Sequence, residues 1–531
     1  MVIPFNDLLK RDILIHSPQF AIIVVTKIKI FQHKKMFNPS GHSFSSSSSS
    51  NLRLPNVLVV GVGEYVTGYV HTSASKSDKP IGVVLLTLFD MKRRGKVNEI
   101  YIAGTQGTKY PQIRQHLTKG LSRYNFVKCE KMQKGTDEIS IDEYLNGTFP
   151  DDHIEKDIYA YREGLKKLNK GDVVFIFTPD HTHHQIALEA VKAGMHVLVA
   201  KPLVQKLEHH YELIEAIRDN EKTENGSRRV MVGVEVHKRW DPIYSDARDR
   251  ILNPEEIGDF SYFTSYMSQP SSQLITFKNW AAYSDISYYL NSHHIDFHCW
   301  SLGGMETRLE NQRFWRPYRV FASGSYGIAN SEPFNIETED SITLTVQWRD
   351  FSSIVNKKET NLDKCLKGTA IYTSSWVAPK KSDVHSQQRF MYQGSKGEIT
   401  IDQAHRGYTL ASDCSGSMGL RSINPLFMKY SPDVLGRFSG QNGYGYLSLA
   451  SFVEAAFMWE NGIVSDFDIL KEQLATVDFV QGKTPSLTAT LLTTAILDAG
   501  RKSLNKQLEN STQGDVIIHY DLETLLPTRL E

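Results

Sequence analysis

The stretch Val173–Gln205 constrains the fold of this chain more than any other segment. It opens with an apolar run, Val173–Phe177, which is typical of a buried strand. Apolar residues at helix spacing follow, Gly194 stands where a helix would end, and His196–Ala200 is a second strand-like run. Strand, helix and strand within about thirty residues predict a βαβ unit, so the two strands are parallel and the helix covers one face.

Polar residues end both predicted strands of this unit. Thr178-Pro179-Asp180 follows the first strand, and Lys201 is the only full charge at the end of the second. Ligands of open parallel sheets bind outside the carboxyl ends of the strands, so we expect the chemistry at this edge. A lysine that merely reaches solvent is the alternative, and the strand-end position favours a functional one. The cofactor contacts expected here are Thr178, Pro179, His181 and Lys201.

A glycine-containing turn follows another strand-like run, Val57–Val60. Gly61 would allow a tight turn, and Gly63 would let backbone N–H groups approach a pyrophosphate at a helix N-terminus. The third glycine of the dinucleotide fingerprint is expected where this chain has Val66. The glycine pair alone therefore leaves an ordinary strand–helix turn open as an alternative. On the dinucleotide interpretation the contacts are Gly61, Gly63, Glu64 and Tyr65.

The choice between NAD and NADP depends on the end of the next predicted strand, Ile100–Ala103, which follows a helix predicted over Pro80–Arg94. An Asp or Glu there would bind the ribose 2′-hydroxyl of NAD. Residues 104–109 contain no acid, and Thr105 and Lys109 could bind a 2′-phosphate. The sequence thus favours NADP(H) over NAD(H), unless Lys109 is only a solvated lysine at a helix start.

Strands alternate with helices up to Glu235, and the pattern then changes. Alternation predicts a doubly wound α/β domain. Beyond His237 the chain is β-rich without long helices between the strands, which indicates an α+β domain with a mainly antiparallel sheet. Two late helices, predicted over Leu447–Trp459 and Pro485–Leu504, are expected to pack on one of these layers. The expected domains are an N-terminal extension with a serine-rich linker (1–55), a Rossmann domain (56–236), an α+β substrate or oligomerisation domain (237–505) and a C-terminal tail (506–531).

Bulk properties exclude several functions. The 531 residues exceed one core, and a net charge of zero gives no electrostatic case for nucleic acid or an anionic membrane. The four cysteines are scattered, which suits a reducing compartment and a cytoplasmic protein. The apolar run Ala21–Phe31 is too short and too interrupted by lysines to span a membrane. A mitochondrial presequence is a minor alternative, because Asp7 and Asp12 stand among its basic residues.

Three histidines within six residues form the densest polar cluster. On a helix, His293, Asp296 and Trp300 share one face, and His294 and His298 share the neighbouring one. His294 and His298 have zinc-ligand spacing, but no third ligand is evident, so we expect no metal. We favour His293 or His294 as a general acid/base, because imidazole titrates near neutrality. A structural role for His298 and Asp296 stays open, as does the choice for Arg239 between binding an anion and tying the domains together.

These motifs, in this order, resemble a known family. The turn at Gly61, the run Thr178–Pro202, the segment His237–Pro242 and the helix with His293 and Asp296 are similar to the glucose-fructose oxidoreductase/inositol dehydrogenase (Gfo/Idh/MocA) family. Two segments, Tyr266–Trp280 and Ser287–His298, further resemble the D-galacturonate reductase branch.

The resemblance implies a Rossmann domain, a second domain with a large open-faced sheet, NAD or NADP, and a sugar or polyol substrate. The family site combines the lysine of Glu-Lys-Pro with an Asp and a His four residues apart. Lys201 matches the lysine and His293 the histidine, whereas Ala200 and Tyr289 replace the two acids. Tyr289 or His294 would then have to complete the proton relay.

The resulting hypothesis is hydride transfer between nicotinamide and a sugar carbonyl, with reduction of a uronate such as D-galacturonate to an aldonate as the favoured reaction. His293 would protonate the alkoxide and Lys201 would polarise the carbonyl. The residues expected to contact the substrate are Arg239, Lys278 and Asp296, with His294 as a further cation for the carboxylate. The main alternative is an inactive NADP-binding sensor, and a metal-dependent hydrolase is the most distant one. A large open sheet is compatible with a homo-oligomer.

Overall fold

The structure is a computed structural model of the 531-residue chain. Residues 53–531 form one compact unit, to which the fold below belongs. The residues that the structure describes are 52–70, 73–75, 79–123, 141–221, 230–303, 314–355, 361, 364–380, 382–406, 409–411, 420–422, 424–427, 431–432, 438–439, 443–463, 484–509 and 514–531. Most of the extension expected over residues 1–55 therefore lies outside the described residues.

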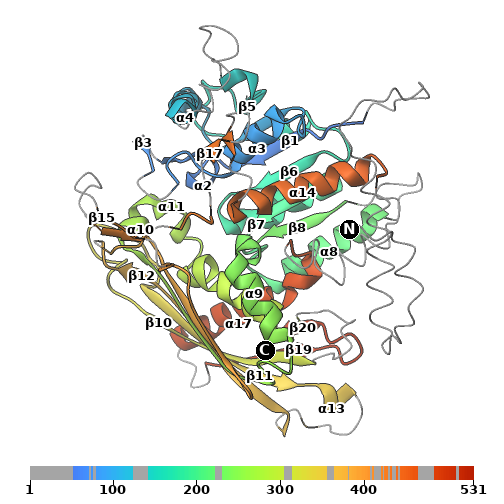
Figure 1. Ribbon diagram of the computed structural model, residues 1–531, viewed down its shortest axis with the longest axis vertical. Coiled ribbons are helices and arrows are strands. Elements are labelled where there is room, and N and C mark those ends of the chain that lie inside the picture. Colours follow the sequence, from blue (N-terminus) through green and yellow to red (C-terminus); the bar gives the residue numbers. More distant parts are fainter. Residues whose placement is uncertain are drawn as a thin grey trace, which may run out of the picture. The chain divides into compact units, whose positions relative to one another are not determined.

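Six parallel strands form the first sheet (Figure 1). Their spatial order is β5 (Gly147–Phe149), β4 (Ile100–Ala103), β1 (Val57–Val60), β6 (Val173–Ile176), β7 (His196–Ala200) and β8 (Val232–Glu235). Every neighbouring pair is parallel. The strand order reverses between β1 and β6, which is the switch point at which ligands bind in such sheets. The predicted doubly wound α/β fold is confirmed.

Helices cover both faces of this sheet, because alternate strand residues face opposite layers. In β1, Val57 and Val59 belong to one core, and Leu58 and Val60 to the other. The covering helices are α3 (Val84–Arg93), α4 (Tyr110–Arg123) and α14 (Tyr444–Glu460) on one face, and α6 (Tyr161–Leu165), α7 (His183–Lys192) and α8 (Leu207–Glu221) on the other.

Helix α14 returns to the first sheet from late in the chain. The ring centroid of Phe452 lies 6.4 Å from that of Phe175 in β6, and Figure 1 shows α14 running along this sheet. One of the two late helices predicted by the sequence thus completes the Rossmann layer. The boundary expected between residues 236 and 237 therefore does not separate the two cores, because α14 follows this boundary in the chain but packs on the first sheet.

The second sheet has eight strands and is mainly antiparallel, as predicted. Its spatial order is β14 (Glu398–Asp402), β13 (Gln387–Gly394), β9 (Phe260–Pro270), β12 (Leu366–Ala378), β11 (Ser341–Asp350), β10 (Trp315–Ser325), β19 (Val516–Tyr520) and β20 (Pro527–Leu530). Strands β9 and β12 pair in parallel, so the sheet is mixed. The helices that contribute most to its core include α9 (Pro242–Leu252), α12 (Ser292–Ser301) and α17 (Leu487–Leu508). Residues 506–531, expected as a tail, contain the end of α17 and two strands at an edge of this sheet.

The helix after β1 is divided into two parts. Helix α2 (Glu64–Thr67) ends at Gly68, and α3 begins only at Val84, four residues later than the predicted start. The N–H of Val83 donates to the carbonyl of Tyr65 at 2.8 Å, so α3 resumes the hydrogen bonding that α2 began. A side chain on Gly68 would lie 2.4 Å from the nitrogen of Gly82. Gly68 and Gly82 therefore lie in close contact where α2 ends and α3 begins.

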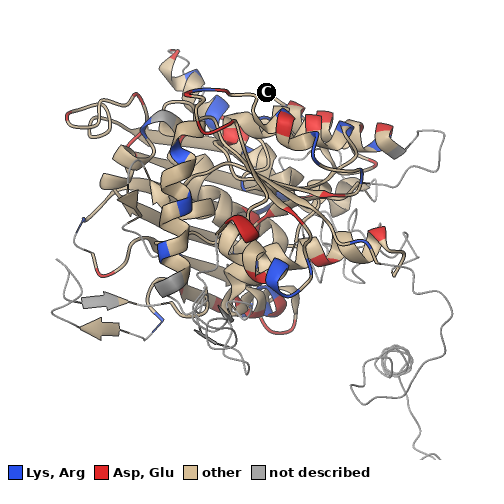
Figure 2. Ribbon diagram, turned by 90° about the horizontal axis from the view of Figure 1, so that it is seen from above, with Lys and Arg blue, Asp and Glu red and all other residues tan. Residues whose placement is uncertain are grey.

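Charge is distributed with both signs present. The formal net charge is zero, and Figure 2 shows basic and acidic residues scattered over the helices and loops, with strands largely uncharged. Within the described part of the chain, no helix is both long enough and apolar enough to cross a membrane.

A buried ion pair joins the first sheet to helix α12, which packs on the second sheet. The Nε and Nη2 atoms of Arg239, in the turn η5 (His237–Trp240) that follows β8, each donate at 2.8 Å to a different carboxylate oxygen of Asp296 on α12. The side chains are 1% and 2% exposed, and the guanidinium carbon lies 5.0 Å from the ring centroid of Trp300.

Removing one partner of this pair should destabilise the protein strongly. We expect Asp296→Ala to lower the free energy of unfolding by about 3–5 kcal/mol, because it removes the carboxylate that accepts two hydrogen bonds from a buried guanidinium. Asp246→Ala is the matched control, since Asp246 pairs with Arg250 on the surface of α9 and should change unfolding little. Urea unfolding measures both variants, and equal effects would contradict the interpretation.

Candidate active site

The two glycines of the first turn differ in what surrounds them. Gly61 has a φ of 119°, and a Cβ there would lie 2.2 Å from the carbonyl oxygen of Phe177. Its N–H donates to the carbonyl of Ala103 at 2.7 Å. At Gly63 no heavy atom lies within 4 Å of such a Cβ. Gly61 is thus required for the packing of β1 against β6, whereas Gly63 leaves open space before α2.

The next two residues of the turn point to different partners. The carboxylate of Glu64 accepts a hydrogen bond from the hydroxyl of Ser75. The ring of Tyr65 stacks on Phe177 and on His237, at centroid distances of 5.6 and 6.1 Å. Tyr65 thereby connects the glycine turn with the histidines described below.

The loop after β6 carries three of the expected cofactor contacts. The hydroxyl of Thr182 lies 2.8 Å from that of Thr178 and donates to the carbonyl of Pro179 at 2.7 Å. His181 is exposed, with its ring centroid 5.1 Å from that of Tyr283. The loop is therefore ordered by its own hydrogen bonds, with Thr178 and Pro179 at the switch-point edge.

His183, which the sequence did not single out, connects the two strand ends. Its Nε2 lies 2.9 Å from the carbonyl oxygen of Thr178 after β6, and its Nδ1 lies 2.9 Å from that of Pro202 after β7. The ring is buried. His183 therefore fixes the spacing between the two loops that flank Lys201.

Lys201 directly follows β7, and its side chain extends to the turn that precedes α12. Its ammonium donates to the carbonyl of Tyr289 and lies 4.5 Å from the centroid of the Tyr289 ring. Burial lowers the pKa of Lys201 to about 7, although the charges of Asp180 and Glu235 act in the opposite direction. A lysine with this pKa exists in both protonation states at neutral pH, which suits a catalytic group.

Asp180 is a site residue that the sequence named only as part of a strand end. Its carboxylate accepts hydrogen bonds from the Trp280 indole at 2.5 Å, the Ser284 hydroxyl at 2.6 Å and the Gln205 amide at 3.2 Å. These donors hold the carboxylate close enough to Lys201 to favour its charged form. Two of the donors lie about a hundred residues away in sequence, so no local pattern reveals them.

His293 lies on the first turn of α12 and is 6% exposed. Its ring centroid is 5.2 Å from that of His237 at an interplanar angle of 62°. Burial, and then the charges of Lys201 and Lys238, lower the pKa of His293 well below its usual value. The imidazole is therefore neutral at physiological pH, in contrast to the near-neutral titration on which the sequence argument relied.

Tyr289 belongs to a π-helical turn, Ser287–Asn291, directly before α12. Such turns occur frequently at functional sites. Its ring stacks on Trp376 at 5.5 Å, and its hydroxyl accepts a hydrogen bond from the Gln269 amide at 3.3 Å. The carbonyl and the ring, rather than the hydroxyl, are the parts of Tyr289 that contact Lys201.

The other two histidines of the cluster lie in the core. His294 is 0% exposed, and its Nε2 lies 2.9 Å from the Tyr244 hydroxyl. His298 is also 0% exposed, with Nδ1 2.6 Å from the Tyr372 hydroxyl. Both rings are therefore enclosed in the core of the second sheet, and each is hydrogen-bonded to a tyrosine hydroxyl. No group of three or more metal-ligating side chains is found among the described residues.

Two of the three expected substrate contacts are paired with each other. Arg239 and Asp296 are buried and bind each other, so neither presents a free charge to a ligand. Lys278 is exposed at the start of the short helix α11 (Lys278–Ala281). Of the two alternatives for Arg239, tying the layers together is the one that its contacts favour.

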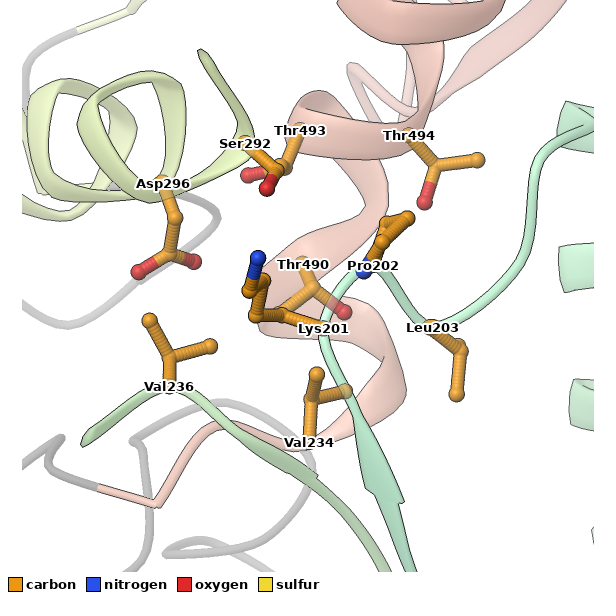
Figure 3. A pocket seen from close by; sticks show the side chains of 10 residues that line it. All are labelled: Lys201, Pro202, Leu203, Val234, Val236, Ser292, Asp296, Thr490, Thr493 and Thr494. Atoms are coloured by element: carbon orange, nitrogen blue, oxygen red, sulfur yellow. The ribbon is translucent and has the colours of Figure 1, made fainter. Parts of the chain in front are cut away.

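A small pocket extends along Lys201 between the two layers (Figure 3). Figure 3 shows Lys201 reaching toward α12, where Ser292 and Asp296 lie, with α17 behind. The lining residues are Lys201, Pro202, Leu203, Val234, Val236, Ser292, Asp296, Thr490, Thr493 and Thr494. The hydroxyl of Ser292 is buried and has no hydrogen-bond partner among the described residues. The pocket thus gives the inner side of Lys201 a partly polar wall.

The end of β4, where the cofactor ribose is expected, is exposed at Thr105 and partly exposed at Lys109. The N–H of Asp157 donates to the Thr105 carbonyl at 2.9 Å. The Asp157 carboxylate in turn accepts a hydrogen bond from the N–H of Tyr159 at 2.8 Å. The loop after β5 therefore places an acid in this neighbourhood, which the sequence of residues 104–109 does not reveal.

A family model matches the part of the chain that carries Lys201. Residues 139–225, which contain β6, α7 and β7, match the Gfo/Idh/MocA model, described as an oxidoreductase family with an NAD-binding Rossmann fold. This match supports the resemblance inferred from the sequence motifs.

Solved structures share the fold. GenD2 from gentamicin A biosynthesis, in complex with NAD, superposes with a TM-score of 0.50 at 13% identity, over 90% of this chain and 100% of that one. The myo-inositol 2-dehydrogenase of Lactobacillus plantarum gives 0.47 at 15% identity, over 86% and 98%. The scyllo-inositol dehydrogenase of Lactobacillus casei, with NAD(H) and scyllo-inositol, gives 0.48 at 14%, over 84% and 96%. At such identities the likeness to GenD2 shows a common fold of a Rossmann-like sheet and a second sheet.

The lowered pKa of Lys201 can be tested without knowledge of the substrate. We expect competitive acetylation followed by mass spectrometry to give a labelling midpoint near pH 7 for Lys201, with exposed Lys278 as the reference. Since the folded pKa lies below the unfolded one, protonation favours unfolding. Stability should therefore rise with pH from about 7 to 10.5, and Lys201→Met should make this rise smaller without abolishing it, because burial also lowers the pKa of Lys238 to about 7. A Lys201 midpoint equal to that of Lys278 would contradict the account.

Proposed function

We propose that this protein is an NAD(P)-dependent oxidoreductase of the Gfo/Idh/MocA family, which transfers hydride between a nicotinamide cofactor and a sugar or sugar acid. The observation that carries the proposal is Lys201. Its ammonium, with a pKa of about 7, lies at the carboxyl end of β7 against Tyr289, in the electrostatic range of His293. A titratable amine beside a neutral imidazole at a switch-point edge is suited to proton transfer during carbonyl reduction.

The residues of the first turn fit a dinucleotide. The open space at Gly63 admits a pyrophosphate to the backbone, and Tyr65 lies beside it. When bound, the cofactor supplies the hydride donor or acceptor. We favour NADP(H), because Thr105 and Lys109 are suited to a 2′-phosphate and no acid stands between residues 104 and 109. The nearby Asp157 acts against this preference, so direct titration of both cofactors decides it.

Lys201 and His293 are the groups that we place on the reacting oxygen. The Lys201 ammonium polarises a carbonyl and stabilises the alkoxide that forms from it. His293 is neutral because its pKa is lowered, so it accepts the hydroxyl proton during alcohol oxidation. During reduction it first takes up a proton from solvent and then gives that proton to the alkoxide. Both steps use groups of this chain and conserve the proton.

A uronate such as D-galacturonate, reduced to an aldonate, is the substrate that we favour. This choice comes from the sequence segments that resemble the galacturonate reductases. Among the cations considered for the carboxylate, Arg239 is bound to Asp296 and His294 is buried, which leaves Lys278. Lys278 stands on the same short helix as Trp280, whose indole binds Asp180 beside Lys201.

Two measurements on the purified protein test this function. Fluorescence titration with NADPH and NADH gives the two cofactor affinities, and loss of nicotinamide absorbance with a panel of uronates and neutral sugars gives turnover. We expect NADPH to bind more tightly and a uronate to be reduced. Tight cofactor binding without turnover on any member of the panel would instead favour an inactive sensor of the same fold, the alternative that Ala200 and Tyr289 suggest.

His293→Gln should lower kcat by about 10²–10⁴-fold, because it removes a positioned proton-transfer group. The affinity for NADPH should stay within about a factor of two, a difference that corresponds to well under 1 kcal/mol. His153→Gln, at an exposed site after β5, is the matched control and should keep wild-type kcat. Near-normal turnover in the His293 variant would refute this role.

A further inference from the structure

Position 200, next to Lys201, is an alanine, and the neighbouring strand carries a carboxylate at the same level. In the parallel pairing of β7 with β8, Ala200 is in register with Glu235. Residues that are directly paired in a sheet project to the same face, so the side chain of Glu235 lies on the face toward which Ala200 points. Glu235 is 4% exposed and interacts with Lys201 strongly enough to oppose the effect of burial.

Both oxygens of Glu235 have partners from other elements. One oxygen accepts a hydrogen bond from the hydroxyl of Ser448 on α14 at 2.8 Å. The other lies 3.5 Å from Nδ1 of His237, whose side chain is 17% exposed. The carboxylate is thus fixed by the helix that returns to the first sheet, and it faces the turn that leads into the second.

The ring of His237 is held by aromatic neighbours. It stacks between Tyr65 and Tyr444, at centroid distances of 6.1 and 5.9 Å and interplanar angles of 23° and 15°. Its edge-to-face contact with His293 has a centroid distance of 5.2 Å. A displacement of the Glu235 carboxylate would therefore reach His293 through a single ring.

We infer that Glu235 is a positioning residue of this site: it supplies from β8 the carboxylate that position 200 lacks, favours the charged form of Lys201, and fixes His237 against His293. Its effect on turnover rests on the function proposed above. Its effect on the charge of Lys201 does not, because that charge can be measured in the absence of any substrate.

Charged groups from several elements face Lys201, and their balance determines what removal of Glu235 does. The groups in electrostatic or pocket contact with Lys201 are Asp180, Glu235, His237, Lys238, His293 and Asp296. Asp296 is already neutralised by Arg239. Without Glu235, Asp180 would have to offset both the burial and the cationic neighbours, so the neutral amine would gain population.

Glu235→Gln tests the inference in the full-length protein. We expect it to lower the acetylation midpoint of Lys201 by roughly 0.5–1 pH unit. The alkaline limb of the kcat–pH profile should move to lower pH by the same amount, while KM changes less than kcat. Glu235→Asp should restore part of both shifts. Glu454→Gln, which removes a carboxylate from the exposed part of the same helix as Ser448, is the control and should leave both unchanged.

Moving the carboxylate from β8 to the paired position on β7 gives a second test. In the double variant Ala200→Glu/Glu235→Ala, the acid returns to the same face one strand away, and the Lys201 midpoint should return toward that of the wild type. Circular dichroism and thermal melting verify that each variant is folded. An unchanged Lys201 midpoint in folded Glu235→Gln overturns the inference. A shifted midpoint in a protein without turnover on any sugar would retain it and reject the proposed function.

Discussion

Burial of the Lys201 ammonium is the interaction on which the rest of the site depends. Removing such a charge from water costs on the order of several kcal/mol, so it must be compensated by groups that the fold places around it. These groups are the carbonyl and ring of Tyr289 and the carboxylates of Asp180 and Glu235. They come from the π-helical turn before α12, the loop after β6 and the end of β8. The lysine is therefore held only when both layers of the structure have assembled.

The same assembly explains why the first sheet draws on distant parts of the chain. Helix α14 covers this sheet and fixes Glu235 through Ser448, while the Arg239–Asp296 pair attaches the turn after β8 to α12. His293 stands on the same helix as Asp296, three residues earlier. The ion pair therefore holds the helix that carries His293 against the turn after β8.

Much of this architecture follows from local sequence patterns. The buried runs at Val57–Val60 and Val173–Phe177, with the helix between the latter and His196–Ala200, predicted the parallel sheet and the edge at which Lys201 lies, since strand and helix periodicity are local properties. The turn at Gly61 could also be predicted from the sequence, because a close approach of two backbones excludes any side chain there.

Contacts between residues far apart in the chain could not be predicted from the sequence. Trp280 and Ser284 bind Asp180 from about a hundred residues away, and Ser448 binds Glu235 from more than two hundred. Arg239 was a candidate for substrate binding because an isolated arginine shows no partner in the sequence, whereas its carboxylate lies on α12. Helix periodicity placed His293 and His294 on neighbouring faces, but it could not show that His294 binds Tyr244 whereas His293 contacts His237.

The most direct test of the account is isotope transfer. A nicotinamide cofactor that carries deuterium at its reactive carbon is incubated with the protein and a uronate, and the product is examined by mass spectrometry. We expect one deuterium in the aldonate formed by the wild type and almost none with Lys201→Met, although both proteins bind the cofactor. Absence of deuterium transfer to every uronate and neutral sugar, in a folded protein that binds the cofactor, would contradict it.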